Sequence, residues 1–145
     1  MPKYASDYAP ASTLSGAELL QLVQAGTDRQ VTAAVLVALS RVPSVQSVAS
    51  AGTVTPTFGN DLVAITAQAV ALTIANPTGT AIPGLGLVIR IKDNGTARAI
   101  TWGSQYRGIG LTLPATTVAG KTAYVAMIYN STDTTWDVVA VGTQA

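Results

Sequence analysis

The residues that could carry chemistry are few and lie far apart along the chain. Neither histidine nor cysteine occurs among the 145 residues. Catalysis through an imidazole base is therefore excluded, and so are metal sites built from cysteine or histidine. The remaining candidates for acid–base chemistry or for a calcium site are the seven carboxylates, Asp7, Glu18, Asp28, Asp61, Asp93, Asp133 and Asp137. No spacing groups them into a pair.

Three of these carboxylates, Asp28, Asp93 and Asp133, fall in predicted turns. Aspartate is common in turns because its side chain accepts hydrogen bonds from nearby backbone amides, so a structural role explains them best. A calcium ion between Asp93 and Asp133 would require their loops to meet in space. A glycosidase-like carboxylate pair stays open as an alternative, although no spacing points to one. We therefore predict a protein that is not an enzyme, with no cofactor and no bound metal.

The large side chains of the C-terminal half are candidates for binding. Trp136 shares an alternating pattern with Val138 and Ala140, which are expected on its side of the strand and favour packing in a core or at an edge. Trp102 and Tyr106 flank a glycine-containing loop. Together with Arg107 they are candidate interface residues, because Trp, Tyr and Arg concentrate binding energy at protein interfaces. Such aromatic residues also stack on sugars, so a carbohydrate-binding module is an alternative.

The composition limits the possible partners. Charged residues make up only 10% of the chain, against roughly a quarter in a typical soluble domain. The net charge is +1, and no dense basic stretch is present to bind a phosphate backbone, so we expect no nucleic acid partner. The segment MPKYASDYAP lacks the apolar core of a secretory signal. The longest apolar run, Ala33 to Leu39, is too short to cross a bilayer, and we expect no membrane contact.

Short strands joined by glycine and proline turns are predicted from Thr53 onward. In the clearest one, Leu87, Ile89 and Ile91 point to one face. Asp93-Asn94-Gly95 is predicted to form a hairpin turn. The predicted strands cover residues 62–67, 70–75, 85–92, 97–102, 123–129 and 135–141. This pattern predicts a mainly β fold, an antiparallel β-sandwich over residues 53–145 and preferably a jelly roll.

Residues 1–52 are predicted to form an N-terminal arm that carries attachment. A turn signal at Gly26-Thr-Asp-Arg29 favours a hairpin within residues 14–32, whereas a capping-box pattern that ends at Glu18 leaves a helix open. A short helix is expected from Thr32 to Leu39, and a linker over residues 41–52. The candidate interface residues of the arm are Leu14, Glu18, Leu20 and Leu22.

Two stretches resemble structural proteins of tailed bacteriophages. Leu14-Ser-Gly-Ala-Glu18, followed by Val23-Gln24-Ala-Gly26, is similar to an "L-T-G-x-E … Q-G" segment of phage fibre and head-associated proteins. The segments LTIANPTGT, VIRIKDNGTARAITWGSQYR and LPATTVAGKTAYVAMIYNSTDTTWDVVAV are similar to a β module of phage structural proteins, capsid cement (decoration) proteins among them. The resemblance implies a virion protein with a β-sandwich fold and symmetric self-association.

A compact decoration protein fits this resemblance best. It would be made in the cytoplasm of the host bacterium and would bind the capsid exterior, where it bridges neighbouring copies of the major capsid protein. A head-fibre, collar or tail-fibre attachment module is the alternative. Strands with apolar residues on both faces need a second burial partner, and a closed homo-oligomer supplies one. The decoration-protein analogy favours a homotrimer over a homodimer.

Overall fold

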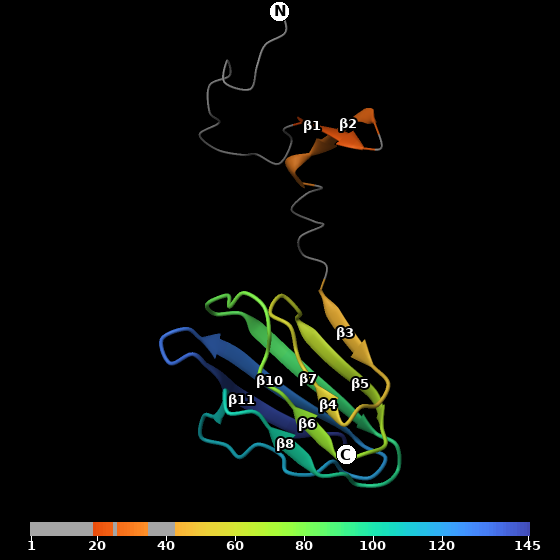
Figure 1. The fold of residues 1–145 in the computed structure, drawn as a ribbon, viewed down its shortest axis with the longest axis vertical. Coiled ribbons are helices and arrows are strands. Elements are labelled where there is room, and N and C mark those ends of the chain that lie inside the picture. The colour runs from red at the N-terminus through yellow and green to blue at the C-terminus, as the bar shows by residue number, and fades with distance from the viewer. Residues whose placement is uncertain (1–18, 25, 35–42) are drawn as a thin grey trace, which may run out of the picture. The chain divides into compact units, whose positions relative to one another are not determined.

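In a computed structural model the chain divides into two compact units, with the boundary between Val42 and Pro43. The structure describes residues 19–24, 26–34 and 43–145 (Figure 1). We call residues 43–145 the C-terminal unit.

The N-terminal unit contains the hairpin that the turn signal favoured. Strands β1 (Leu19–Gln24) and β2 (Thr27–Thr32) pair antiparallel. Gly26 stands between them with φ of 77°, a left-handed conformation that glycine adopts without steric cost. Of the helix expected from Thr32 to Leu39, residues 33–34 are helical and residues 35–39 lie outside the described residues. The extended segment expected over residues 1–13 also lies outside them.

Nine strands build the C-terminal unit, so the mainly β prediction is confirmed. They are β3 (Val45–Val48), β4 (Thr53–Val54), β5 (Leu62–Gln68), β6 (Leu72–Ile74), β7 (Gly86–Asp93), β8 (Ile100–Trp102), β9 (Tyr106–Gly108), β10 (Thr122–Asn130) and β11 (Thr135–Thr143). One sheet has six strands in the order β3-β5-β7-β10-β11-β9, and the other has three in the order β4-β6-β8 (Figure 1).

The chain alternates between the two sheets from β3 to β8. Strands β3, β5 and β7 belong to the six-stranded sheet, and the intervening strands β4, β6 and β8 form the other. Neighbouring strands in each of these series are parallel, because every return to a sheet passes through the opposite one. Only β10 pairs antiparallel with its neighbours β7 and β11 in this unit. The six-stranded sheet is therefore mixed and the three-stranded sheet is parallel, so the antiparallel arrangement predicted from the sequence is wrong.

The predicted hairpin at Asp93-Asn94-Gly95 accounts for much of this error. The turn is present, with Gly95 at φ of 114°. However, both edges of β7 are occupied by β5 and β10, so the chain cannot fold back onto β7. It crosses to the three-stranded sheet and forms β8 beside β6. Turn chemistry fixes the reversal of the chain but not its next partner strand.

The linker predicted over residues 41–52 contains strand β3, which forms one edge of the six-stranded sheet. Its start is held against β5 by four hydrogen bonds. The Ser44 carbonyl accepts from the amides of Asp61 and Leu62. The Ser44 amide donates to Asp61 Oδ2 (2.7 Å), and the Ser44 hydroxyl donates to Asn60 Oδ1 (2.7 Å). The β-rich unit thus begins at Pro43 rather than at Thr53.

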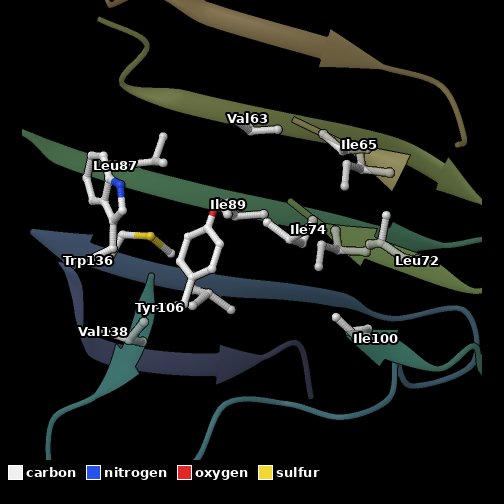
Figure 2. Packing of buried hydrophobic residues seen from close by; sticks show 14 of the residues in the cluster. Val63, Ile65, Leu72, Ile74, Leu87, Ile89, Ile100, Tyr106, Trp136 and Val138 are labelled. Atoms are coloured by element: carbon white, nitrogen blue, oxygen red, sulfur yellow. The ribbon is translucent and has the colours of Figure 1, made fainter. Parts of the chain in front are cut away.

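A single apolar core joins the two sheets (Figure 2). Ile89 of the six-stranded sheet and Ile74 of the three-stranded sheet are both 0% exposed. Burying each such side chain stabilises the fold by roughly 1.5–3 kcal/mol. Trp136 is 1% exposed and stacks on Phe58 with ring centroids 5.4 Å apart. The prediction that Trp136 packs in a core or at an edge is confirmed, and Val138 lies in the core with it. Ala140, expected on the same side, is exposed, because a bulge in β11 shifts the register after Val138.

Candidate docking surface

The candidate interface residues of the N-terminal arm divide into two groups. Leu14 and Glu18 lie outside the described residues. Leu20 and Leu22 lie in strand β1, where they pair with Val31 and Arg29 of β2.

Trp102 and Tyr106 lie together, as the sequence suggested, but they are largely committed to the fold. Their rings meet edge to face with centroids 5.4 Å apart. Tyr106 is 8% exposed and donates its hydroxyl to the Ala75 carbonyl (2.9 Å), and burial raises the pKa of its phenol. Trp102 is half-buried and donates its indole N–H to the Pro114 carbonyl (2.8 Å). Tyr106 is therefore a core residue, which leaves little of its surface for a partner.

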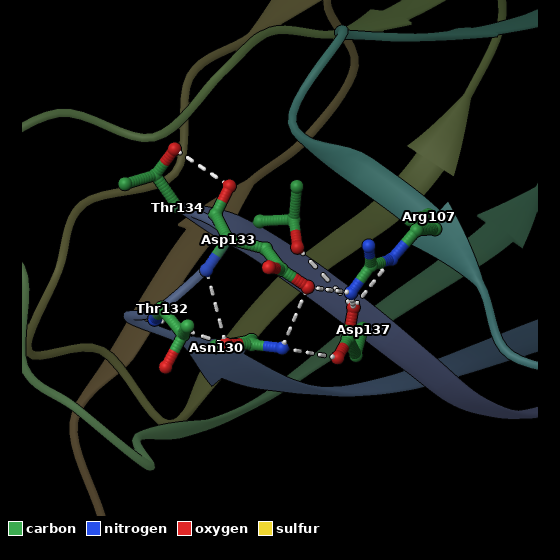
Figure 3. A network of polar contacts seen from close by, with 7 residues as sticks. Arg107, Asn130, Thr132, Asp133, Thr134 and Asp137 are labelled. Carbon is green, nitrogen blue, oxygen red and sulfur yellow. Dashed lines mark hydrogen bonds and ion pairs between the residues drawn. The ribbon is translucent and has the colours of Figure 1, made fainter.

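Arg107 is exposed and anchors a polar network at the turn between β10 and β11 (Figure 3). Its guanidinium lies 2.8 Å from Asp133 Oδ2 and 2.8 Å from Asp137 Oδ1. The side-chain amide of Asn130 donates to both carboxylates, and its Oδ1 accepts from the amides of Thr132 and Asp133. This network was not predicted from the sequence, because Arg107 lies 26 and 30 residues from its partners.

This network pairs the two carboxylates with a positive charge from within the protein. The hydrogen bonds that the Arg107 guanidinium donates to Asp133 and Asp137 raise its pKa. Hydrogen bonds from Asn130 and Arg107 lower the pKa of Asp137 against the opposing effect of its partial burial. The guanidinium thus supplies the positive charge that a metal ion would otherwise bring. No group of three or more possible metal-ligating side chains occurs within the part of the chain that the structure describes.

Asp93 is a buried structural carboxylate at the far end of strand β7. It is 1% exposed and accepts hydrogen bonds from the Thr117 hydroxyl (2.6 Å) and from the amides of Gly95 (2.7 Å) and Gly120 (2.9 Å). Burial alone would raise its pKa, but these bonds and the charge of Arg98 outweigh burial, and the pKa is lowered. Its bond to Gly95 is the local turn contact that the sequence indicated.

Exposed apolar side chains occur on the side of the six-stranded sheet that faces away from the core, which we call the outer face. Side chains that share one register position form an apolar row across five adjacent strands. The members of this apolar row are Val45, Leu62, Val88, Ala126 and Ala140. Only side chains on one face of a sheet line up in this way, so the row is continuous from β3 to β11.

Large apolar side chains extend the outer face on both sides of the apolar row. Tyr124 is 47% exposed and Ile128 is 46% exposed, and Val139, at the bulge of β11, is 49% exposed. The inward residues of the same strand β10, such as Val125 at 0% and Met127 at 2%, belong to the core. Strand β10 therefore carries apolar side chains on both faces, as the sequence indicated. A contiguous exposed apolar surface of this kind is typical of an interaction site.

Comparison with protein-family models, with curated proteins and with solved structures finds no match to this chain. Among the described residues, no helix is long and apolar enough to cross a membrane. The outer face, with its exposed apolar side chains, is the candidate functional site.

Proposed function

We propose that this chain is a non-catalytic structural protein of a tailed-bacteriophage virion, a cement protein that binds the capsid exterior and bridges neighbouring major capsid subunits. The observation that carries the docking role is the outer face, an exposed apolar surface on a well-packed unit. The choice of a phage shell as the partner follows from the resemblance of LTIANPTGT and the segments after it to phage structural proteins.

Two further features support a docking role. The chain is poor in charge, with seven acidic and eight basic residues among 145, so few groups oppose close contact with another protein surface. The chain is also divided into two units at Pro43. This division allows one unit to hold the shell while the other covers or bridges it. Repeated over a lattice, modest contacts of this kind add up to stable attachment through avidity.

The proposed division of labour assigns attachment to residues 1–42 and the stable fold to residues 43–145. The boundary moves from Thr53 to Pro43, because β3 is part of the six-stranded sheet. Symmetric self-association, as a homotrimer or as a homodimer, is part of the proposal. It would cover the apolar outer face without open-ended aggregation.

The test is the number of copies of the chain in particles of the phage that encodes it. Quantitative mass spectrometry of purified virions gives the copy number, and a cement protein is expected in hundreds of copies. A handful of copies per particle would overturn the cement role and favour the head-fibre, collar or tail-fibre alternative. Binding to a glycan array, lost on Trp102→Ala, would favour the carbohydrate-binding alternative.

The division of labour is tested with a chain that begins at Pro43. It is expected to melt cooperatively, with a β-rich circular dichroism spectrum, and to bind shells far more weakly than the full chain. Equal binding by the two chains would show that residues 1–42 are not the anchor. Asp133→Ala and Asp137→Ala in the full chain are matched controls, and we expect each to leave binding within a few-fold.

A further inference from the structure

We propose that the outer face of the six-stranded sheet is a contact between two copies of this chain, packed with their strands antiparallel about a two-fold axis. This inference deepens the self-association within the proposed function and favours the homodimer over the homotrimer. It rests on the apolar row and on a charge asymmetry along the strands of the same sheet.

The apolar row supplies the centre of the contact. It crosses five strands, and Val45 at one edge is 51% exposed. Five strands about 4.8 Å apart and about seven residues of about 3.3 Å each give a projected area of roughly 550 Å² per copy. The relief of the side chains raises the accessible area above this projection. Two copies thus reach the total of about 1,200 Å² at which specific interfaces begin.

One end of the sheet is basic. Directly beside the apolar row, Arg90 of β7 pairs with Tyr124 of β10, and Lys92 pairs with Thr122 one step further along. Lys121 immediately precedes β10, and its amine donates to the Ala145 carbonyl (2.6 Å). Arg90 and Lys92 line a shallow hollow of about 260 Å³ together with Tyr124. The Lys92 amine donates to the Gly120 carbonyl (2.6 Å). Within residues 43–145 neither of these two cations forms an ion pair, so no carboxylate neutralises either charge.

The opposite end of the sheet is acidic. On the other side of the apolar row, Ile128 pairs with Asp137, and Asp137 pairs with Arg107. Asp133 lies in the adjoining turn, and Asp61 immediately precedes strand β5. Three carboxylates and one guanidinium leave this end with a net charge of about −2. At the basic end, Arg90, Lys92 and Lys121 together with the buried Asp93 carboxylate give about +2. The face therefore carries both halves of a complementary charge pattern.

A two-fold axis that runs along the apolar row would bring the opposite charges of the two copies together. Rotation about such an axis reverses the strand direction and lays the apolar row of one copy over the same row of the other. The basic end of each copy then meets the acidic end of its partner, and Tyr124 of β10 comes opposite Ile128 of the partner copy. An unrelated acidic partner would use the basic end alone. A second copy uses both ends and the apolar row between them.

The oligomeric state of the full chain, measured by light scattering at micromolar concentration without shells, tests the contact. A dimer is expected. Ala126→Glu places two like charges opposite each other on the axis and is expected to give a monomer with an unchanged circular dichroism spectrum. Val118→Glu is the matched control, because Val118 is exposed (50%) but lies outside the strands of the sheet, and this variant is expected to remain a dimer.

Charge reversal tests the antiparallel arrangement, including the case in which Ala126→Glu fails to fold. Arg90→Glu with Lys92→Glu makes both ends acidic, and Asp61→Lys with Asp133→Lys makes both ends basic. Each double variant alone is expected to dimerise at least about tenfold more weakly than the wild type, and an equimolar mixture is expected to form a heterodimer.

A monomeric or trimeric wild-type chain would overturn the two-fold contact, as would double variants that dimerise like the wild type. These results are independent of the virion copy number. A failure of the cement role therefore leaves this contact untouched, and a failure of the contact leaves the cement role to be judged on particles.

Discussion

Replacing Asp93 by alanine tests whether the C-terminal unit depends on a buried carboxylate rather than on apolar packing alone. The carboxylate accepts three hydrogen bonds at 2.6–2.9 Å, and its residue is 1% exposed. Alanine leaves the amides of Gly95 and Gly120 and the hydroxyl of Thr117 without this acceptor. Each buried donor left without a partner costs about 1–3 kcal/mol. Water reaches the exposed Gly95 and Gly120, so we expect a total loss of about 3–5 kcal/mol.

Thermal unfolding followed by circular dichroism measures this loss. At about 4 °C per kcal/mol for a domain of this size, the melting midpoint should fall by roughly 12–20 °C. Asp133→Ala is the matched control, because Asp133 is exposed, and its midpoint should stay within about 2 °C of the wild type. An Asp93→Ala protein that melts within the same 2 °C would refute the structural role of this carboxylate.

The pH dependence gives an independent check, with Asp93→Asn as the probe. The pKa of Asp93 is lowered in the folded protein, whereas the unfolded chain has a value near 3.9. Folding is therefore favoured by the ionised carboxylate at neutral pH, and this contribution is lost as the pH falls below about 4 towards the folded pKa. The stability difference between wild type and Asp93→Asn should be constant near neutral pH and shrink in acid. A difference that stays constant down to pH 3 would contradict the assigned pKa direction.

Three further predictions concern strand β9 and its surroundings. Gly108→Ala should lower the free energy of unfolding by about 1–3 kcal/mol, because the added methyl would meet the Leu111 carbonyl oxygen. A denaturant titration measures this loss, and Gly86→Ala, where the methyl meets nothing, is the matched control. Tyr106→Phe should cost about 1 kcal/mol by removing a half-buried hydrogen bond, and an unchanged denaturation midpoint would count against that bond. Arg107→Ala should lower the melting midpoint slightly at low salt and not at 1 M salt, because exposed ion pairs are screened; an equal loss at both salt concentrations would contradict an ion-pair origin.

Local patterns in the sequence predicted local structure well. The alternation of β7 was correct, with Leu87, Ile89 and Ile91 buried and Val88 and Arg90 partly exposed. Period-two alternation depends only on which face of a strand meets the core, so it can be read directly from the chain. The hairpin around Gly26 was recognisable for a similar reason, because a turn residue lies between two strand-like segments.

Strand partners could not be predicted in the same way. The parallel pairing of β5 with β7 joins residues about 26 positions apart, and no turn residue specifies it. Strand β3 was missed because it is a half-exposed edge strand whose Gln46 and Ser47 resemble linker residues. The Arg107 network was missed because its members come together only when β9 lies beside β11. Each of these features depends on how strands that are far apart in the sequence pair with one another.

The four hydrogen bonds of Ser44 at the start of β3 determine how the protein would respond to mechanical load. The chain enters the six-stranded sheet at its edge, so tension between residues 1–42 and the C-terminal unit reaches β3 first. Such tension would load the contacts between β3 and β5 first, beginning with the bonds by which Ser44 holds Asn60 and Asp61. Rupture there would release β3 and leave β5 paired with β7. The detached edge strand would lengthen the connection to the C-terminal unit and relieve the load before the core of that unit opens.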